Sequence, residues 1–489
     1  MPIALTSMIT FVAYLTVVIV FGLIAYIATR NLSDYVLGGR SLGGPVAALS
    51  AGASDMSSWL LLGLPGLVYA TGLRQIWVAI GLTLGAYLCW RLIAKPLRVY
   101  SEFANDSVTI PAFLDNRFKD DTKRIRMIAA LATLIFFVFY IAAGLYASAL
   151  LLGRIFGLEY TQALLIGAAI IMFYTTIGGF LAVSWTDFFQ GTIMLICLLL
   201  IPYFAMESYG GWGAGIDKLL SQQPDYLQVK VPFSEFISDF AWGLGYFGMP
   251  HILVRFMSVK TVYEIPIARR ICIGWMSLSM LGAILVGMVG AIHFCDCPLD
   301  NRETVFMELS TMVFSPWIMG IILATILSSS MCAADSQMLA ASSALTEDFY
   351  RAIFRRNASQ KELVWVGRLT VALIALVAIS IAYTPKQNIM QLVSFAWAGL
   401  GSTFAAPMIL SLFWKRTTRN GIVVGMIVGA LTSIVWPALG LDALVYQILP
   451  GVVFSFVAIV VISLLDNEPP QAVLEEFEKV KKIVQSTSA

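Results

Sequence analysis

The chain has 489 residues, of which 59% are hydrophobic and only 12% are charged, and its mean hydropathy is +0.83. Soluble domains carry about a quarter charged residues, so this composition excludes an ordinary soluble protein and indicates a polytopic membrane protein. The formal net charge is +2. Because the basic residues lie in separate loops and not on one face, a nucleic-acid partner is also excluded.

Apolar windows of about 20 residues, the length of a helix that crosses a bilayer, predict thirteen spans. They are 5–29, 43–70, 75–94, 127–152, 161–183, 188–206, 234–257, 271–294, 313–343, 366–384, 389–413, 420–439 and 444–465. We expect one transmembrane domain over residues 1–466 and a short, solvated cytoplasmic helix over 467–489. The first segment has no basic region before its apolar run, so it reads as a span and not as a cleaved signal peptide.

The Lys and Arg residues favour one orientation. With the N-terminus outside, the predicted inner segments hold 25 of the 31 basic residues. The outer segments hold the other six, namely Arg74, Arg154, Lys218, Lys230, Arg302 and Lys386. By the positive-inside rule, we expect a multi-pass protein of the cell (inner) membrane with a cytoplasmic C-terminus.

The second predicted span has a polar centre, in which Asp55 lies among Ser50, Ser54, Ser57 and Ser58. A charged side chain at membrane depth costs roughly 2.5–3.5 kcal/mol on insertion scales. Irregular backbone is tolerated there only where protein or a watery cavity surrounds it. We therefore predict a discontinuous helix whose broken centre faces a binding site. The alternative is a straight helix in which the carboxylate pairs with a neighbouring cation.

Two connections carry smaller signals. The inner loop 95–126 is the most charged, and we expect a surface helix before Pro111. The six cysteines show no metal-ligand spacing, and four of them lie in apolar segments, where thiols usually pack as small hydrophobic groups. Cys295 and Cys297 lie in a predicted outer loop, where a disulfide stays open as an alternative.

The seventh predicted span is also interrupted, because residues 240–251 read FAWGLGYFGMPH. Three glycines and a proline within eight residues disfavour a continuous helix, so we predict that it unwinds here. Trp242 and Tyr246 are four residues apart and face one side if the outer half remains helical. An ordinary lipid-facing or core aromatic pair is the alternative.

Five helices separate the start of the second span from the start of the seventh, and an odd count inverts the second set. Two five-helix units of opposite topology, each opening with an interrupted helix, are typical of transporters with a site at the membrane midplane. The chain is therefore predicted to be a transporter that works by alternating access.

Three stretches resemble the sodium/solute symporter family. They are GGRSLGG at 38–44, continuing to SDMS at 54–57 and GLPG at 63–66; TIGGF at 176–180 with WTDFFQ at 185–190; and WGLGYFG at 242–248 with PH at 250–251. The resemblance implies an all-α integral membrane protein of about 13 transmembrane helices around a five-plus-five inverted-repeat (LeuT-type) core. It also implies import of proline coupled to sodium influx, with sodium as the co-transported ion and with no other cofactor or obligate protein partner.

Carried over by this resemblance, the substrate lies near Ser57, Tyr140, Trp242, Tyr246 and Pro250. The assignment suits the chemistry of the substrate. The pyrrolidine ring of proline packs on flat apolar and aromatic walls. Its carboxylate suits the free N–H groups and the positive dipole at the start of a half-helix.

The resemblance also places sodium between the broken second span and the ninth span. Its expected ligands are the backbone carbonyls of Ala53, Met56 and Ser329, because a hard cation prefers oxygen. The family's hydroxyl-bearing Ser-Thr pair falls on Cys332 and Ala333, so both hydroxyl ligands are missing. Ser328 and Ser330 offer hydroxyls only if the register shifts.

Four charged residues are expected to act in coupling. Asp55 is a nearby anion that tunes the site, and Arg40 is a cytoplasmic-side residue or an ordinary positive-inside anchor. Asp187 and Asp335 either form an acidic ion site deeper on the cytoplasmic side, or one of them carries a proton. The coupling ion therefore stays open between sodium at an altered site, protons or weak coupling, and sodium-independent exchange.

Smaller departures also leave the substrate range open, because Ser58 and Met249 replace the family's Gly and Gln. Two rival classes are considered. An intramembrane aspartyl enzyme would need facing carboxylates, and the aspartates here lack a recognisable catalytic context. A transport-derived sensor would need a signalling domain beyond the short tail. We therefore expect a transporter and not an enzyme.

Overall fold

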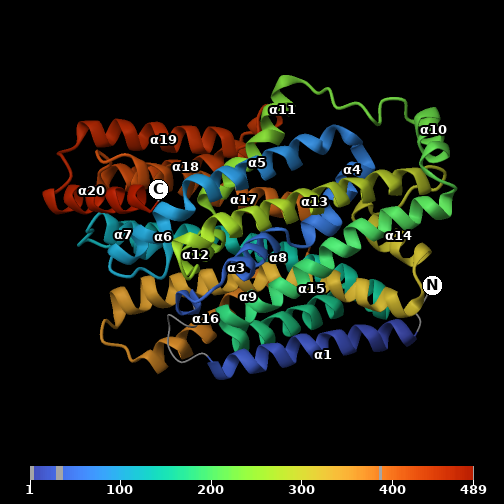
Figure 1. Cartoon of the computed structure of the whole chain (residues 1–489), viewed down its shortest axis with the longest axis horizontal. Helices are drawn as coiled ribbons and strands as arrows, with labels where there is room; N and C mark the ends of the chain where they lie inside the picture. Colours follow the sequence, from blue (N-terminus) through green and yellow to red (C-terminus); the bar gives the residue numbers. More distant parts are fainter. Residues whose placement is uncertain (1–4, 29–36, 385–387, 488–489) are drawn as a thin grey trace.

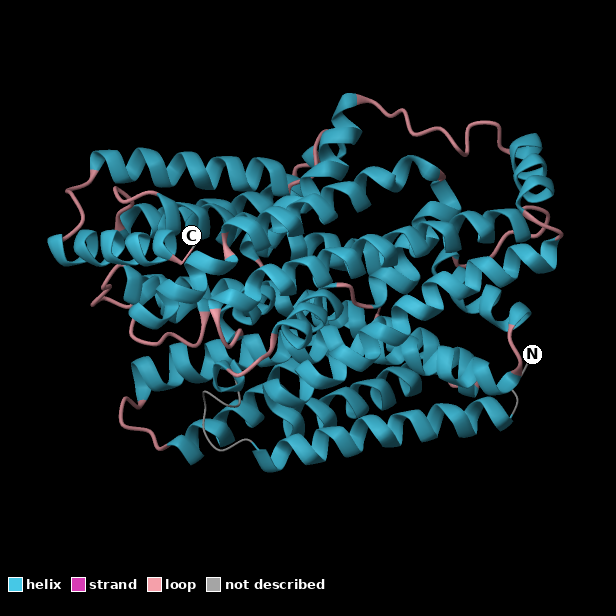
Figure 2. Ribbon diagram, in the orientation of Figure 1, coloured by secondary structure: helices cyan, strands magenta, loops and turns pink. Residues whose placement is uncertain are grey.

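The structure is a computed structural model, and it describes residues 5–28, 37–384 and 388–487. Lys386, one of the predicted outer cations, lies outside these ranges. Most of the long helices run beside one another along the longest axis of the molecule, with α1 at one edge and α18 and α19 near the other (Figure 1). Helices account for all the regular structure drawn in the described residues (Figure 2). The predicted all-α class is confirmed.

The elements in chain order are α1 (Leu5–Ala28), η1 (Gly38–Arg40), α3 (Gly44–Asp55), η2 (Trp59–Gly63), α4 (Leu64–Thr71), η3 (Leu73–Gln75), α5 (Ile76–Leu92), α6 (Ala94–Phe103), α7 (Ile110–Arg117), α8 (Arg124–Phe156), α9 (Tyr160–Tyr209), α10 (Trp212–Gln222), α11 (Phe233–Phe240), η4 (Ala241–Gly248), α12 (Pro250–Ser258), η5 (Val262–Glu264), α13 (Ile265–His293), η6 (Arg302–Thr304), α14 (Val305–Val313), α15 (Pro316–Ser343), η7 (Ala344–Phe354), α16 (Gln360–Ala382), α17 (Ile389–Phe413), α18 (Arg419–Ala438), η8 (Leu441–Ala443), α19 (Ile448–Leu465) and α20 (Gln471–Ser486).

Each of the thirteen predicted spans has a helical counterpart. Within the described ranges, nine helical segments are long and apolar enough to cross a membrane: Leu73–Leu92, Arg124–Phe156, Gly179–Tyr209, Val262–His293, Pro316–Ala352, Gln360–Ala382, Ile389–Phe413, Arg419–Ala438 and Ile448–Leu465. The other four predicted spans fall on α1, on the first part of α9 and on the two interrupted elements. The count of thirteen therefore stays a prediction.

The predicted break in the second span is confirmed. Helix α3 ends at Asp55, and Met56 leaves the helical region with φ −79° and ψ 50°. The Ser57 N–H donates to the carbonyl of Asp55 at 2.9 Å, so it does not bond the Ala53 carbonyl as a continuous helix would. A wider π-helical turn, η2, then leads into α4, which has a proline in its first turn.

The predicted unwinding of the seventh span is also confirmed. Helix α11 passes into the 3₁₀ segment η4, Met249 is extended, and α12 begins at Pro250. Glycine is needed in η4 because a Cβ on Gly245 would lie 2.1 Å from the indole nitrogen of Trp397.

The segment of this span that carries Trp242 and Tyr246, η4, is a 3₁₀ helix and not an α-helix, so the predicted shared face does not form. A 3₁₀ helix has three residues per turn, which sets residues four apart on different sides. The Trp242 ring stacks on Tyr446 with centroids 5.0 Å apart, whereas the Tyr246 ring meets Trp397 edge to face at 5.2 Å.

The two interrupted elements lie against each other. Helix α3 packs on α9, α12, α13 and α15. The residues before α3 and after α12 are joined by an isolated parallel bridge between Leu42 and Val259, in which Leu42 donates to Ser258 and accepts from Lys260. The breaks themselves meet inside the helical bundle, where the Tyr246 hydroxyl donates to the Asp55 carboxylate.

Helix α9 covers two predicted spans, 161–183 and 188–206, in one run. The backbone breaks at Gly179, with φ 64° and ψ −176°. This conformation suits glycine because a Cβ would be strained there. The boundary between the two spans therefore lies a few residues earlier than the sequence predicted.

Three expectations outside the spans can be compared with the structure. The loop 95–126 contains α6 and α7, so the expected helix before Pro111 is confirmed. The tail forms α20, but it is not simply solvated, because its apolar face, including Phe477, is buried and packs on α6. Cys295 and Cys297 are both free, so the disulfide left open by the sequence is absent.

Candidate functional site

Asp55 lies at the point where the two broken elements meet. The residue is 1% exposed, and its Oδ2 accepts a short hydrogen bond from the Tyr246 hydroxyl, while Oδ1 has no partner in the described structure. Its backbone carbonyl accepts from the Trp59 indole at 3.0 Å and from the Tyr140 hydroxyl at 3.4 Å. The described residues place no cation in an ion pair with Asp55, so the alternative of a straight, cation-paired helix is wrong.

Aromatic rings surround this junction. Trp397 of α17 connects two of the predicted substrate residues, because its indole donates to the Trp242 carbonyl at 2.8 Å and its ring contacts Tyr246. On the other side, the Tyr140 ring meets His251 edge to face, with centroids 6.2 Å apart. These flat surfaces are of the kind that packs against a small apolar ring.

The structure brings most of the predicted substrate residues together. Tyr140 and Tyr246 both hydrogen-bond to Asp55, and Ser57 is buried in the same break with its Oγ 3.4 Å from the Trp59 N–H. Pro250 opens α12 and lines a narrow pocket beside His251. Trp242 is connected to the others through Trp397.

The predicted sodium residues line up on facing helices. At the end of α3, the Ala53 carbonyl has lost its helical partner, and Met56 forms the cap. On α15, Ser329, Cys332 and Ala333 are all buried. The Ser329 hydroxyl is used within its own helix, where it donates to Ile326 at 2.7 Å. Its side chain therefore replaces neither missing hydroxyl.

Asp187 forms a buried ion pair that the sequence did not predict. Its Oδ2 accepts from Ser50 at 2.7 Å and Ser54 at 2.9 Å, and lies 3.3 Å from Nη2 of Arg255. Arg255 also donates to the Ser336 hydroxyl and to the His251 carbonyl, both at 2.6 Å. Arg255 is the lone cation inside the predicted span 234–257, which was a signal for a buried partner. From the sequence alone, it was included only among the inner positive charges.

Asp335 takes a different partner. Its Oδ1 is within hydrogen-bond reach of the Thr175 hydroxyl, whose oxygen also lies 2.8 Å from the Ile171 carbonyl, so the two oxygens share one hydroxyl hydrogen. Asp187 lies on α9 and binds α3 and α12, whereas Asp335 lies on α15 and binds Thr175 of α9. The described structure therefore places no direct contact between the two acids.

Arg40 lies away from this central site. Its guanidinium donates to Asp106 and Ser101 at 3.0 Å each and to the Met257 carbonyl at 2.7 Å. Burial lowers the pKa of Arg40, and the nearby Asp106 carboxylate opposes this shift. The residue therefore ties η1 to the loop after α6 and to the end of α12.

Comparison with known sequences decides the family. The sequence model described as "Sodium:solute symporter family" matches residues 35–429. The chain belongs to the sodium:solute symporter family. The resemblance seen in the sequence is thereby confirmed, and the polar, interrupted helices lie within the matched part of this symporter.

Curated relatives match the symporter over nearly its whole length. The sodium/proline symporter of Escherichia coli strain K12 is 47% identical over 485 residues, covering 98% of this chain and 96% of the relative. The high-affinity proline transporter PutP of Bacillus subtilis strain 168 is 46% identical over 463 residues, covering 94% and 98%.

Solved structures share the fold of the symporter. A Na⁺-coupled sialic acid symporter in a substrate-bound, outward-open state superposes with a TM-score of 0.82 at 18% identity, covering 96% of this chain and 99% of that one. Mhp1, a nucleobase-cation-symport-1 family transporter, gives 0.58 at 14% identity, with 91% and 98% covered. These neighbours confirm the LeuT-type architecture.

Proposed function

We propose that this symporter imports L-proline together with sodium by alternating access. Curated relatives named for this activity are 46–47% identical over 94% or more of the chain. The observation that carries the proposal is the meeting of the two broken helices at Asp55, where a buried carboxylate, freed backbone and aromatic rings lie together. Such a junction is what a small zwitterion and a cation require.

In this proposal, Ser57, Tyr140, Trp242, Tyr246 and Pro250 form the substrate site. The rings pack against the pyrrolidine ring of proline. The N–H groups at the start of the helix that follows the break attract its carboxylate, because a helix N-terminus carries partial positive charge. The buried Asp55 carboxylate lies nearby, where it favours the positive amino group.

The proposed sodium site uses the backbone oxygens of Ala53, Met56 and Ser329. Cys332 and Ala333 stand at the positions where the family resemblance implies hydroxyl ligands. A helix C-terminus carries partial negative charge, so the end of α3 favours a cation. Asp55 adds a full negative charge at this end.

Coupling is assigned to Asp55, Arg40, Asp187 and Asp335. The second candidate function is proton-coupled or weakly coupled uptake of proline or a related small amino acid or solute. Two features favour it: both implied hydroxyl ligands are missing, and the buried Asp335 has no cation within hydrogen-bond reach in the described residues.

The arrangement in the membrane is also proposed. Residues 1–466 form the transmembrane transporter domain in the cell membrane, with the N-terminus outside, and 467–489 form a cytoplasmic tail. The excess of basic residues in the predicted inner segments supports this orientation. Labelling of single cysteines in 260–264 and 296–300 from each side of the membrane tests it.

The deciding experiment is uptake of labelled proline into proteoliposomes under separately imposed sodium and proton gradients. Accumulation driven by an inward sodium gradient supports sodium symport. Accumulation driven only by a proton gradient supports the second candidate. Proline binding without accumulation under either gradient would sink both.

A further inference from the structure

The buried carboxamide of Gln190 on α9 is only partly hydrogen-bonded. Gln190 is 2% exposed, and its Oε1 accepts from the Cys332 thiol at 2.6 Å. Its Nε2 is buried and has no hydrogen-bond partner in the described part of the chain. A thiol is a weak donor, and burying a polar group without good partners is costly. The placement therefore calls for another role for this side chain.

Gln190 is the chain neighbour of a residue that packs against the broken end of α3. The next residue, Gly191, packs so closely on α3 that a Cβ there would lie 3.2 Å from the Cβ of Ala53. Ala53 is the residue whose carbonyl loses its helical partner at the break. Gln190 thus immediately precedes the residue of α9 that packs on Ala53.

A second buried oxygen points to the same helix. Asp187 precedes Gln190 by three residues, which places both on one face of α9. Its Oδ1 is buried without a hydrogen-bond partner within the described ranges. Helix α9 therefore contributes two poorly bonded oxygens near Cys332. One is Oε1 of Gln190, which accepts only from a thiol, and the other is Oδ1 of Asp187, which has no hydrogen-bond partner in the described ranges.

We infer that Oε1 of Gln190 is a sodium ligand in this chain and replaces the hydroxyl that Cys332 lacks. The inference rests on the proposed function and names one further ligand of the same site. Carbonyl and carboxylate oxygens suit hard cations, whereas sulfur ligands suit soft ones. Sodium binding exchanges the weak thiol hydrogen bond for an ion–oxygen contact, and the unpartnered Oδ1 of Asp187 lies one turn earlier on the same helix.

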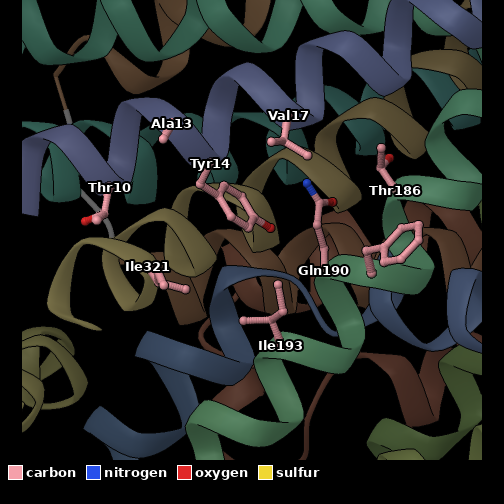
Figure 3. A pocket seen from close by; sticks show the side chains of 9 residues that line it. Thr10, Ala13, Tyr14, Val17, Thr186, Gln190, Ile193 and Ile321 are labelled. Atoms are coloured by element: carbon pink, nitrogen blue, oxygen red, sulfur yellow. The ribbon is translucent and has the colours of Figure 1, made fainter. Parts of the chain in front are cut away.

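The surroundings leave the side chain room to turn. Gln190 and Tyr14 face each other across a cavity of about 560 Å³ between α1, α9 and α15, lined mainly by apolar groups such as Ile193 and Ile321 (Figure 3). This cavity beside the carboxamide leaves space for the side chain to leave Cys332.

The test compares two substitutions of Gln190 in two backgrounds. Gln190→Met keeps the length of the side chain and removes its oxygen, whereas Gln190→Glu keeps an oxygen. Each is made in the wild type and in the Cys332→Ser, Ala333→Thr protein, which restores both hydroxyls. The readouts are the sodium concentration for half-maximal proline uptake and the sodium-dependent rise in melting temperature of the detergent-purified protein.

We expect Gln190→Met to raise the half-maximal sodium concentration by about tenfold or more in the wild type, and Gln190→Glu to raise it far less. In the background with restored hydroxyls, the effect of Gln190→Met should shrink to about threefold or less, because another ligand takes its place. Gln447→Met, at another buried glutamine with 5% exposure, is the matched control and should leave sodium dependence unchanged.

Two results would overturn the inference: equal effects of Gln190→Met in both backgrounds, or wild-type sodium dependence in Gln190→Met. If Gln190→Met does not fold, a tenfold loss in Gln190→Glu would also overturn it, since the oxygen is retained there. Failure of the proposed function is distinguishable, because the wild type itself would then show no sodium-driven uptake.

Discussion

Arg255 and Asp187 form an ion pair at the centre of the protein, with 3.3 Å between Nη2 and Oδ2 and with side chains 2% and 0% exposed. The same guanidinium donates to Ser50 on α3 and to Ser336 on α15. One side chain thus joins α12 to three other helices. Any rearrangement that separates α12 from α9 must break this pair.

Removing one member of this pair should be strongly destabilising. Arg255→Met leaves the Asp187 carboxylate buried without its cation, and breaking a buried pair costs about 3–5 kcal/mol. The double substitution Arg255→Met, Asp187→Asn removes both charges and should lose less stability than Arg255→Met alone. Thermal unfolding of the purified proteins measures this. Losses that simply add would contradict a direct pair.

Removing the charge of Asp55 should abolish tight sodium binding and leave the fold intact. Asn has the same shape and still accepts the hydrogen bond from Tyr246. A unit charge about 4 Å from an ion is worth about 4 kcal/mol at an effective dielectric constant of 20, so Asp55→Asn should weaken apparent sodium affinity roughly 100-fold or more.

Sodium titration of proline uptake measures the effect of Asp55→Asn. Tyr246→Phe is the matched variant, because it removes the hydroxyl that donates to Asp55 and leaves the charge in place. It should have a much smaller effect on sodium dependence. Normal sodium affinity in Asp55→Asn would remove Asp55 from the site.

Trp242→Ala should weaken proline binding with little effect on sodium dependence. The ring stacks on Tyr446 at 5.0 Å and supplies one apolar wall, and an aromatic contact of this kind contributes about 0.5–1.5 kcal/mol beyond its buried area. We expect the half-maximal proline concentration to rise about tenfold. Trp436→Ala, on α18 outside the repeat core, is the control. Similar losses in both variants would point to a general folding effect.

Phe477→Ala should destabilise the protein through its tail. The Phe477 ring lies 5.2 Å from the guanidinium carbon of Arg117, which is fully buried and also faces Tyr100. Burial lowers the pKa of Arg117, while Tyr100 and Glu476 oppose that shift. Loss of a buried Phe costs about 3–5 kcal/mol.

The melting temperature of the purified protein measures the effect of Phe477→Ala. Phe103→Ala, which removes a half-exposed ring on α6 that contacts Lys479, should lower the melting temperature much less. An unchanged melting temperature in Phe477→Ala would show that α20 does not contribute to the folded core.

The two interruptions were predictable because their causes are local. A carboxylate among serines at membrane depth, and three glycines followed by a proline, disfavour a continuous helix whatever surrounds them. The kind of helix that replaces it is not local. Segment η4 is 3₁₀ and packs tightly on Trp397, so the rings of Trp242 and Tyr246 contact different partners, which helical spacing did not predict.

The roles of Gln190 and Arg255 show where such prediction ends. Neither residue stands out in its own stretch of sequence. The role of Gln190 follows from its contact with Cys332, and the role of Arg255 follows from its contact with Asp187. These partners are 142 and 68 positions away along the chain. The packing of α20 was likewise not predictable, because its amphipathic pattern is compatible both with a helix in solvent and with a helix that packs on α6.

Apolar run length, charge placement and helix-breaking residues were thus enough to identify a helical membrane transporter whose two interrupted spans open opposed repeats, because each of these properties acts within one segment. The packing of helices against one another decided the contacts of the site. It brings Asp55 to Tyr246, Arg255 to Asp187, and the carboxamide of Gln190 to Cys332. In a bundle of helices, the close packing of side chains from distant segments sets those contacts, and no single segment encodes them.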